Sequence, residues 1–213
     1  MKVGVLGSGD VGRVLGAGFV SFGHDVKLGS RDPHQEKLKA WAKAAGAKAS
    51  TGTFAEAAAF GDVLVLATAW SGTESALKLA DAKNFAGKVV LDATNPLDMS
   101  TMPPGLAVGP KDSAGERVQR WLPGARVVKA FNSVGNAHMV RPSFPGGPPD
   151  MPICGNDAKA KETATKICRD FGWNVIDLGG IESSRYLEPL AMVWILHYFA
   201  TKSPNHAFKL LTK

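Results

Sequence analysis

The feature that most constrains the fold is a glycine-rich segment near the start of the chain, Gly7-Ser8-Gly9-Asp10-Val11-Gly12. It fits the pattern G-x-G-x-x-G, follows the short apolar run at residues 3–6, and precedes a helical pattern. In this spacing, one glycine permits a tight turn, the next lets the backbone approach a pyrophosphate, and the third lets the helix pack on the sheet. The context therefore predicts a strand–turn–helix unit that binds a dinucleotide. The alternative is a glycine-rich turn that binds nothing.

The end of the next expected strand, residues 25–28, indicates which dinucleotide is bound. An NAD site places an acidic residue beside the adenosine ribose, whereas this chain has Ser30 and Arg31 there. A guanidinium donates two parallel hydrogen bonds to a phosphate and keeps its charge, so the pair favours the 2′-phosphate of NADP. Lys37 could add a more distant charge. The alternative is a solvated arginine beside a turn, with Asp32-Pro33 as the N-cap and first residue of a helix.

Strand and helix patterns alternate along the rest of the chain, which predicts parallel strands joined by right-handed crossovers. We expect a Rossmann-type, doubly wound α/β sheet with a small C-terminal α/β extension. Residues 1–213 are predicted to be a single dinucleotide-binding domain. Its Rossmann core spans 1–140, and the extension at 151–213 completes the substrate cleft and contacts a second subunit. Strands are expected at 62–67, 88–92, 126–130, 151–154 and 174–178, and helices at 34–45, 53–59, 73–82, from 113, at 157–171 and at 184–199.

Two segments rich in proline and glycine, 94–111 and 141–150, interrupt this alternation. Both follow strands, so we expect both at the carboxyl edge of the sheet, where ligands bind; a plain linker is the alternative for the second. Asn95, Pro96, Asn132 and Ser133 follow strands and are expected to face the nicotinamide. They offer hydrogen bonds but little acid–base power. Hydride transfer between two stacked rings needs no acid–base residue, so we predict no catalytic side chain.

Composition excludes several other classes of protein. The chain has 25 Lys and Arg against 19 Asp and Glu, but they are dispersed, so we expect no nucleic-acid partner. Cys154 and Cys168 lie outside metal-ligand spacing and are expected to be reduced core residues, and no metal is predicted. No apolar run reaches the roughly 18 residues needed to span a bilayer, and the expected first strand leaves no room for a signal peptide. We therefore expect a cytoplasmic protein with no membrane partner. His197, among apolar residues, is expected in the core, and His138 near the cleft.

Four segments together, GSGDVGRVLG, LGSRDP, VVKAFNS and MPICGND, resemble the NADPH:coenzyme F420 oxidoreductase family. They are also similar to the reductase domains of the six-transmembrane metalloreductases. The resemblance runs in the same order from residue 1 to about residue 200. It implies that the glycine loop holds the pyrophosphate and that Ser30 and Arg31 hold the 2′-phosphate. The residues that it places along the cofactor after the fourth strand are Thr68, Ala69 and Trp70.

The resemblance also implies a flat ring stacked on the nicotinamide, either the deazaflavin coenzyme F420 or a flavin such as FMN or FAD. The expected activity is therefore hydride transfer between NADP(H) and such a small-molecule redox substrate. Asn132 departs from the deazaflavin enzymes, which have histidine there, so the acceptor stays open between the two rings. The residues expected around the acceptor are Asn132, Val134, Ala137, His206 and Phe208.

Two other classes of function remain open from the sequence. A reductase of another small substrate would share the first half of the chain, but usually needs a large helical domain and a catalytic lysine or acid. A non-catalytic NADP sensor would keep the phosphate site without an acceptor cleft. The apolar run at residues 190–199 must be buried in this chain or against a second copy, so we expect a homodimer.

Overall fold

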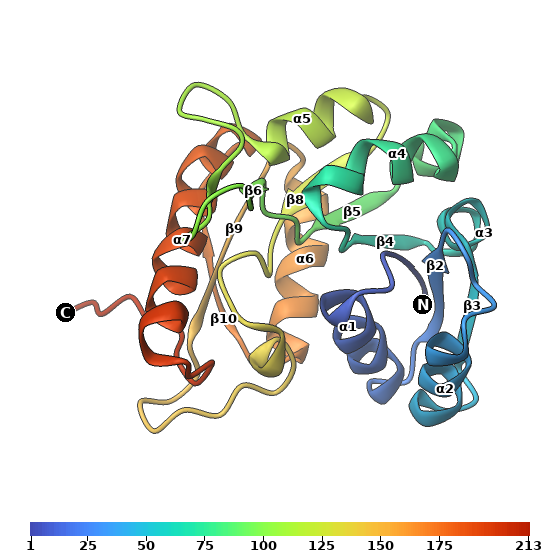
Figure 1. Ribbon diagram of the computed structural model, residues 1–213, viewed down its shortest axis with the longest axis horizontal. Helices are drawn as coiled ribbons and strands as arrows, with labels where there is room; N and C mark the ends of the chain where they lie inside the picture. Colours follow the sequence, from blue (N-terminus) through green and yellow to red (C-terminus); the bar gives the residue numbers. More distant parts are fainter.

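The computed structural model describes all residues from 1 to 213, and its centre is one eight-stranded sheet (Figure 1). The strand order is β10-β9-β8-β5-β4-β1-β2-β3. All neighbouring strands are parallel except β8 and β9, which are antiparallel. This confirms the Rossmann-type α/β class. The strands are β1 (Lys2–Leu6), β2 (Asp25–Ser30), β3 (Ala49–Thr53), β4 (Val63–Leu66), β5 (Val89–Asp92), β8 (Arg126–Lys129), β9 (Asp150–Gly155) and β10 (Asn174–Asp177).

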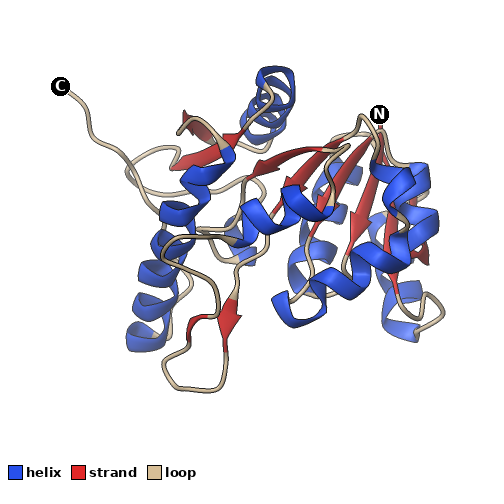
Figure 2. Ribbon diagram, turned by 90° about the horizontal axis from the view of Figure 1, so that it is seen from above, coloured by secondary structure: helices blue, strands red, loops and turns tan.

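Helices cover both faces of the sheet (Figure 2). Side chains alternate between the two faces along each strand, so β4 sends Val63 and Val65 into one apolar core and Leu64 and Leu66 into the other. The first core is closed by α1 (Asp10–Ser21), α2 (Glu36–Ala45) and α6 (Ala158–Asp170). The second is closed by α3 (Phe54–Phe60), α4 (Trp70–Ala80) and α5 (Ala114–Trp121). This double winding leaves the carboxyl ends of β1, β4 and β5 together at one edge.

Three local features differ from the sequence expectations. Strand β3 was not expected, because its sequence ASTGT is small and polar and the strand lies at the edge of the sheet. Helix α2 begins at Glu36, two residues after the expected start at residue 34, since Asp32 Oδ1 accepts a hydrogen bond from the His34 amide and closes a turn there. The proline-rich segment after β5 contains a short antiparallel hairpin, β6 (Leu97–Asp98) and β7 (Gly105–Leu106).

The C-terminal part of the chain extends the same sheet. Strands β9 and β10 pair in parallel, and the last segment runs beside β9, where the Asp150 amide donates to the Phe208 carbonyl at 3.0 Å. Helix α7 (Ser184–Thr201), in red at the left of Figure 1, packs against α5 and β7. Short 3-10 turns complete the chain: η1 (Ala82–Phe85), η2 (Asn136–His138) and η3 (Ile181–Ser183).

Helix α7 buries only one of its faces. Leu187, Ala191 and Trp194 are buried, whereas Val193 and Leu196 are exposed. The expectation of a core position for His197 was wrong, because His197 lies on the exposed face, with its ring edge-on to His206. None of the helices combines the length and the apolar character needed to cross a membrane. Both cysteines are buried and free, as expected.

Candidate functional site

The glycine loop borders a cleft of about 450 Å³ at the carboxyl ends of β1, β2 and β4. A Cβ on Gly7 would lie 2.3 Å from the Ala67 carbonyl oxygen, and one on Gly12 would lie 1.9 Å from the Gly7 oxygen, so the fold itself requires both glycines. Gly9 is different, since nothing lies within 4 Å of the position that its Cβ would take. Its backbone is therefore open to a ligand. The predicted residues that line this cleft are Gly7, Ser8, Gly9, Ser30, Arg31, Lys37, Thr68 and Ala69.

Three of the helices that begin at this cleft have no side-chain cap at the N-terminus. Helices α1, α2 and α4 have no side-chain cap, and their N-cap residues Gly9, Gln35 and Ala69 line the cleft. Helices α3, α5 and α6 are each capped by a side chain, including α3, whose first residue Phe54 also lines the cleft, and α7, which begins elsewhere, has no side-chain cap. Free N–H groups and the positive end of the helix dipole bind phosphate. The residues present therefore fit the pyrophosphate of a dinucleotide.

One end of the cleft carries cationic side chains. Arg31 and Lys37 are exposed there, and neither makes a hydrogen bond or an ion pair within the protein. Ser30 is buried at the end of β2, with its Oγ 3.3 Å from Ser8 Oγ and 3.4 Å from the Asp32 amide. Two cations without protein partners and a hydroxyl form a suitable site for a phosphate group.

A second cleft of about 460 Å³ continues from the first. The two share Gly9 and residues 67–69, so together they form one groove across the end of the sheet, and we use this name for both clefts. The second cleft reaches the hairpin β6–β7 through Leu97 and Met99, and Trp70 on its lining stacks on Trp121 with ring centres 5.5 Å apart. Four further predicted residues line it: Asp10, Val11, Trp70 and Asn95.

Asn95 connects this cleft to the end of β8. Its Nδ2 donates to the Asn132 carbonyl at 2.7 Å, and Asn132 Nδ2 returns a hydrogen bond to Asn95 Oδ1 at 3.1 Å and another to the Leu187 carbonyl at 2.9 Å. Asn132 Oδ1 is buried and has no partner. A buried carbonyl oxygen without a donor is costly. Asn132 lines neither cleft, so it meets the groove only through its hydrogen bonds to Asn95.

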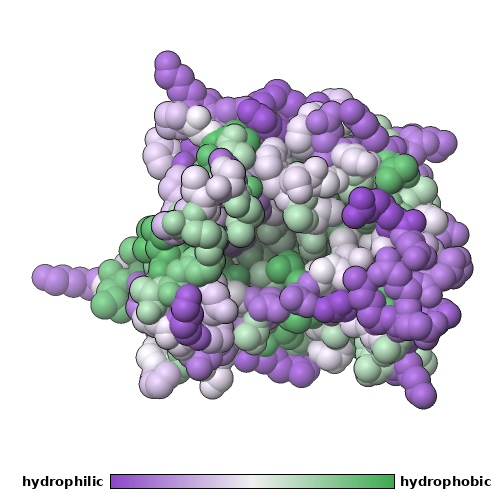
Figure 3. Space-filling model, viewed as in Figure 1, coloured by the Kyte–Doolittle hydropathy of each residue, from purple (hydrophilic) through white to green (hydrophobic).

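The remaining predicted acceptor residues do not line either cleft. His206 stacks on Trp194 at 4.3 Å and Phe208 is tied to β9, while Trp194 packs directly on Gly135 in the loop after β8. The C-terminal segment at residues 206–208 is therefore in contact with the loop after β8 through Trp194. Figure 3 shows this face hollowed near its middle, with hydrophobic surface on the side toward α7. The predicted residues outside both linings are Gly12, Pro96, Asn132, Ser133, Val134, Ala137, His206 and Phe208.

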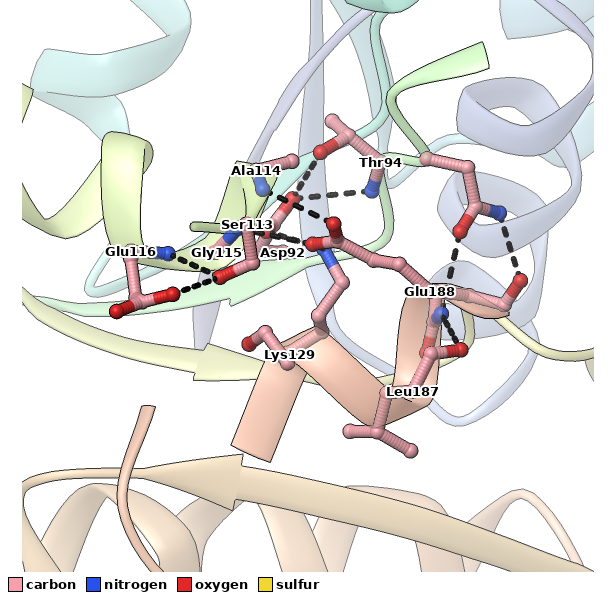
Figure 4. Close-up of polar contacts among 12 residues, drawn as sticks. Asp92, Thr94, Ser113, Ala114, Gly115, Glu116, Lys129, Leu187 and Glu188 are labelled. Atoms are coloured by element: carbon pink, nitrogen blue, oxygen red, sulfur yellow. Dashed lines mark hydrogen bonds and ion pairs between the residues drawn. The ribbon is translucent and has the colours of Figure 1, made fainter. Parts of the chain in front are cut away.

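A buried ion triad was missed by the sequence analysis. Lys129 Nζ lies 2.9 Å from Asp92 Oδ2 and 3.0 Å from Glu188 Oε1, and all three side chains are almost fully buried (Figure 4). Although burial opposes the charge, the two carboxylates raise the pKa of Lys129 above its ordinary value. Glu188 also accepts hydrogen bonds from the Ala114 and Gly115 amides at the start of α5. The signal available in the sequence was a lysine inside the apolar strand VVKA.

The parallel sheet, the glycine loop and the uncapped helices along the groove define a Rossmann-type dinucleotide-binding protein. Residues 2–96 match the family described as NADP oxidoreductase, coenzyme F420-dependent. The solved structure of a putative F420-dependent NADP reductase from Arthrobacter sp. FB24 is 37% identical and superposes with a TM-score of 0.94 over 100% of both chains. The chain belongs to this family of NADP-dependent oxidoreductases, as the sequence motifs indicated.

Two further relatives set the extent of the similarity. The F420-dependent NADP reductase of Methanocaldococcus jannaschii is 32% identical over 143 residues, covering 66% of this chain and 63% of that protein. Metalloreductase STEAP3 of Rattus norvegicus is 30% identical over 191 residues, covering 90% of this chain and 36% of that protein. The chain therefore spans about a third of the metalloreductase and less than two thirds of the archaeal reductase.

Proposed function

We propose that this protein transfers hydride between NADP(H) and a flat ring acceptor, either the deazaflavin coenzyme F420 or a flavin. The observation that carries the proposal is the continuous groove, which has phosphate-binding features at one end and an apolar cleft at the other. NADP(H) supplies the hydride from its nicotinamide ring. The relatives named as F420-dependent reductases and as metalloreductases support a redox role with this cofactor.

The chain's own residues bind and orient the cofactor. Amides at the N-termini of α1 and α4 would hold the pyrophosphate, and Ser30, Arg31 and Lys37 would hold the 2′-phosphate. The nicotinamide would then lie in the second cleft, beside Thr68 and Asn95. This placement follows the general rule that dinucleotides lie across the carboxyl edge of a parallel sheet.

The second cleft supports a ring acceptor because its lining is largely apolar. Trp70, Leu97 and Met99 offer flat or flexible apolar surface, and Asp10 is the only charged residue on the lining. Stacking two rings at van der Waals distance positions the reacting carbon atoms without an acid–base residue at the hydride.

The proposal is tested by anaerobic oxidation of NADPH with a panel of acceptors: coenzyme F420, FMN, FAD, a quinone and a ferric chelate. We expect F420 or a free flavin to be reduced with saturation kinetics. Reduction of ferric chelate only when flavin is present would favour a flavin-linked, metalloreductase-like role. A protein that binds NADPH tightly but reduces no ring acceptor would instead be an NADP sensor, and the proposed function would be rejected.

Replacing Arg31 with alanine is expected to weaken NADPH binding much more than NADH binding. One lost charge-assisted hydrogen-bonding pair costs about 1.5–3 kcal/mol, which corresponds to roughly ten- to a hundredfold in affinity. Energy transfer from tryptophan to bound NADPH or NADH measures both affinities, since Trp70 lies on the groove. Arg169→Ala is the matched control, because Arg169 is exposed on α6, outside the groove. Equal weakening of both cofactors by Arg31→Ala would show that Arg31 does not contact the 2′-phosphate.

We also propose that the exposed face of α7 packs against a second copy of the chain. Val193 and Leu196 are 56% and 43% exposed on this helix, and Figure 3 shows hydrophobic surface on that side of the molecule. Contiguous apolar surface of this kind marks an interaction site. Light scattering at micromolar concentration is expected to give the mass of a dimer, and Leu196→Glu is expected to shift it toward the monomer. A wild-type protein that is strictly monomeric would remove this proposal.

A further inference from the structure

A chain of hydrogen bonds runs from the second cleft of the groove into the protein interior. Thr94 lies on the lining of this cleft, and its Oγ1 donates to Asp92 Oδ1 at 2.7 Å. The other oxygen of Asp92 accepts from Lys129 Nζ at 2.9 Å, and Lys129 is 3.0 Å from Glu188 Oε1 (Figure 4). Every link is at hydrogen-bonding distance, so protons can pass along the series.

The far end of this chain reaches another opening of the protein. Glu188, with Arg185 and Pro189, lines a separate cleft of about 380 Å³ between α7 and the segment that follows β7. The carboxylate of Glu188 is almost fully buried, and its remaining hydrogen bonds come from the first amides of α5. The chain Thr94–Asp92–Lys129–Glu188 therefore runs from the lining of the groove to the lining of a second cleft.

The charges of the triad allow it to hold one additional proton. Two carboxylates and one ammonium group sum to a net charge of −1, so one more proton makes the buried cluster neutral. Other titratable groups nearby do not compete. Burial raises the pKa of Cys154 to about 11, its thiol contacts Ser184 Oγ at 3.3 Å, and Arg185 is paired with Glu116.

We propose that this chain exchanges the proton that accompanies hydride transfer, an inference that rests on the proposed function. Hydride leaves the nicotinamide with two electrons and bonds to a carbon or nitrogen atom of the acceptor ring, and one proton is added at a ring nitrogen. The sum is NADPH plus ring plus H⁺ giving NADP⁺ and the dihydro ring. With the additional proton on Asp92 Oδ1, Asp92 donates to Thr94 Oγ1 while the Thr94 hydroxyl gives its own proton to the ring nitrogen. Lys129 then gives one proton to Asp92 and takes one from Glu188, so the ammonium group is restored. Glu188 recovers the proton from water in its own cleft, and the reverse reaction runs the same path backwards.

Two substitutions at Thr94 separate proton transfer from structure. Thr94→Val keeps the shape of the side chain without its hydroxyl, whereas Thr94→Ser keeps the hydroxyl. With saturating NADPH and the ring acceptor that the wild type reduces, stopped-flow single turnovers from pH 6 to pH 9 measure ring reduction. Loss of a general acid slows a reaction roughly 10²-fold or more. We therefore expect Thr94→Val to reduce the ring more slowly by that factor and Thr94→Ser to reduce it at nearly the wild-type rate. In the valine variant the rate should fall with rising pH and recover with small buffer acids, since the proton then comes from solution.

Affinity for NADPH and thermal stability, measured in the same variants, control for misplacement of the groove. Glu188→Gln is the second variant, because it interrupts the chain at its outer end and leaves both linings of the groove unchanged. A valine variant with the wild-type rate and pH profile overturns the proton path, and so does a serine variant as slow as valine. A wild type that reduces no ring acceptor removes the proposed function and the path together, whereas an active wild type with an unaffected valine variant removes the path alone.

Discussion

Replacing Gly9 with valine is expected to abolish NADPH binding while the protein remains folded. Gly9 has an ordinary φ of −72°, and no atom lies within 4 Å of the position its Cβ would take, so the substitution causes no clash within the protein. The branched side chain would instead occupy the space in front of the α1 N-terminus. Losing two charge-assisted hydrogen bonds to phosphate costs about 3–6 kcal/mol, which is more than a hundredfold in affinity.

Calorimetric titration with NADPH and thermal melting of both proteins measure this effect. Gly146→Val is the matched control, because Gly146 also has nothing within 4 Å of its Cβ position and lies in the loop at 141–150, outside the groove. The control should melt and bind as the wild type does. Substitution of Gly7 would be a poor test, since its Cβ would collide with the Ala67 carbonyl. Tight NADPH binding by Gly9→Val would show that the glycine loop does not hold the pyrophosphate.

Replacing Lys129 with methionine is expected to destabilise the fold strongly. The change removes the only cation bonded to Asp92 and Glu188 and leaves two carboxylates buried beside an apolar side chain. Breaking a buried ion pair by removing one partner costs about 3–5 kcal/mol. In a protein of this size, each kcal/mol lowers the melting temperature by roughly 2–4 °C, so we expect a decrease of about 6–20 °C.

Circular dichroism melts at pH 7 test the expectation for Lys129. Lys39→Met is the control, because Lys39 is exposed and pairs with Glu36 only on the surface of α2. The free energy of unfolding of Lys39→Met should differ from that of the wild type by no more than about 0.5 kcal/mol. A melting temperature of Lys129→Met equal to that of the wild type would mean that the triad does not hold β5, β8 and α7 together.

The parts of the fold that the sequence predicts correctly depend on local patterns. The glycine spacing of residues 7–12 and the apolar runs of β1, β4 and β5 need no partner to be recognised. Ser30 and Arg31 meet the glycine loop because a strand end and a helix start must lie together in this unit, and the structure places them with Lys37 on one cleft. The position of these phosphate-binding residues therefore follows from the order of the first two strands and the helix between them.

The parts that sequence patterns miss depend on contacts distant in the chain. Strand β3 has no apolar run because an edge strand buries little of its surface. The triad joins Asp92, Lys129 and Glu188 from two strands and a helix, and only the fold brings Glu188 to the other two. The tail at residues 206–208 lies beside β9 and Trp194, which no local pattern indicated.

The most direct test of the proposed activity follows the hydrogen itself. NADPH carrying deuterium at both C4 positions of the nicotinamide is mixed anaerobically with the protein and oxidised coenzyme F420, and the reduced deazaflavin is analysed by mass spectrometry. Deazaflavin accepts hydride at carbon, so a transferred deuterium stays in place. We expect one deuterium per reduced ring, with none lost to water, because in the proposed reaction the hydride passes directly from one stacked ring to the other. Failure to reduce F420 or any flavin while NADPH binds, or reduced deazaflavin without deuterium, would contradict direct hydride transfer.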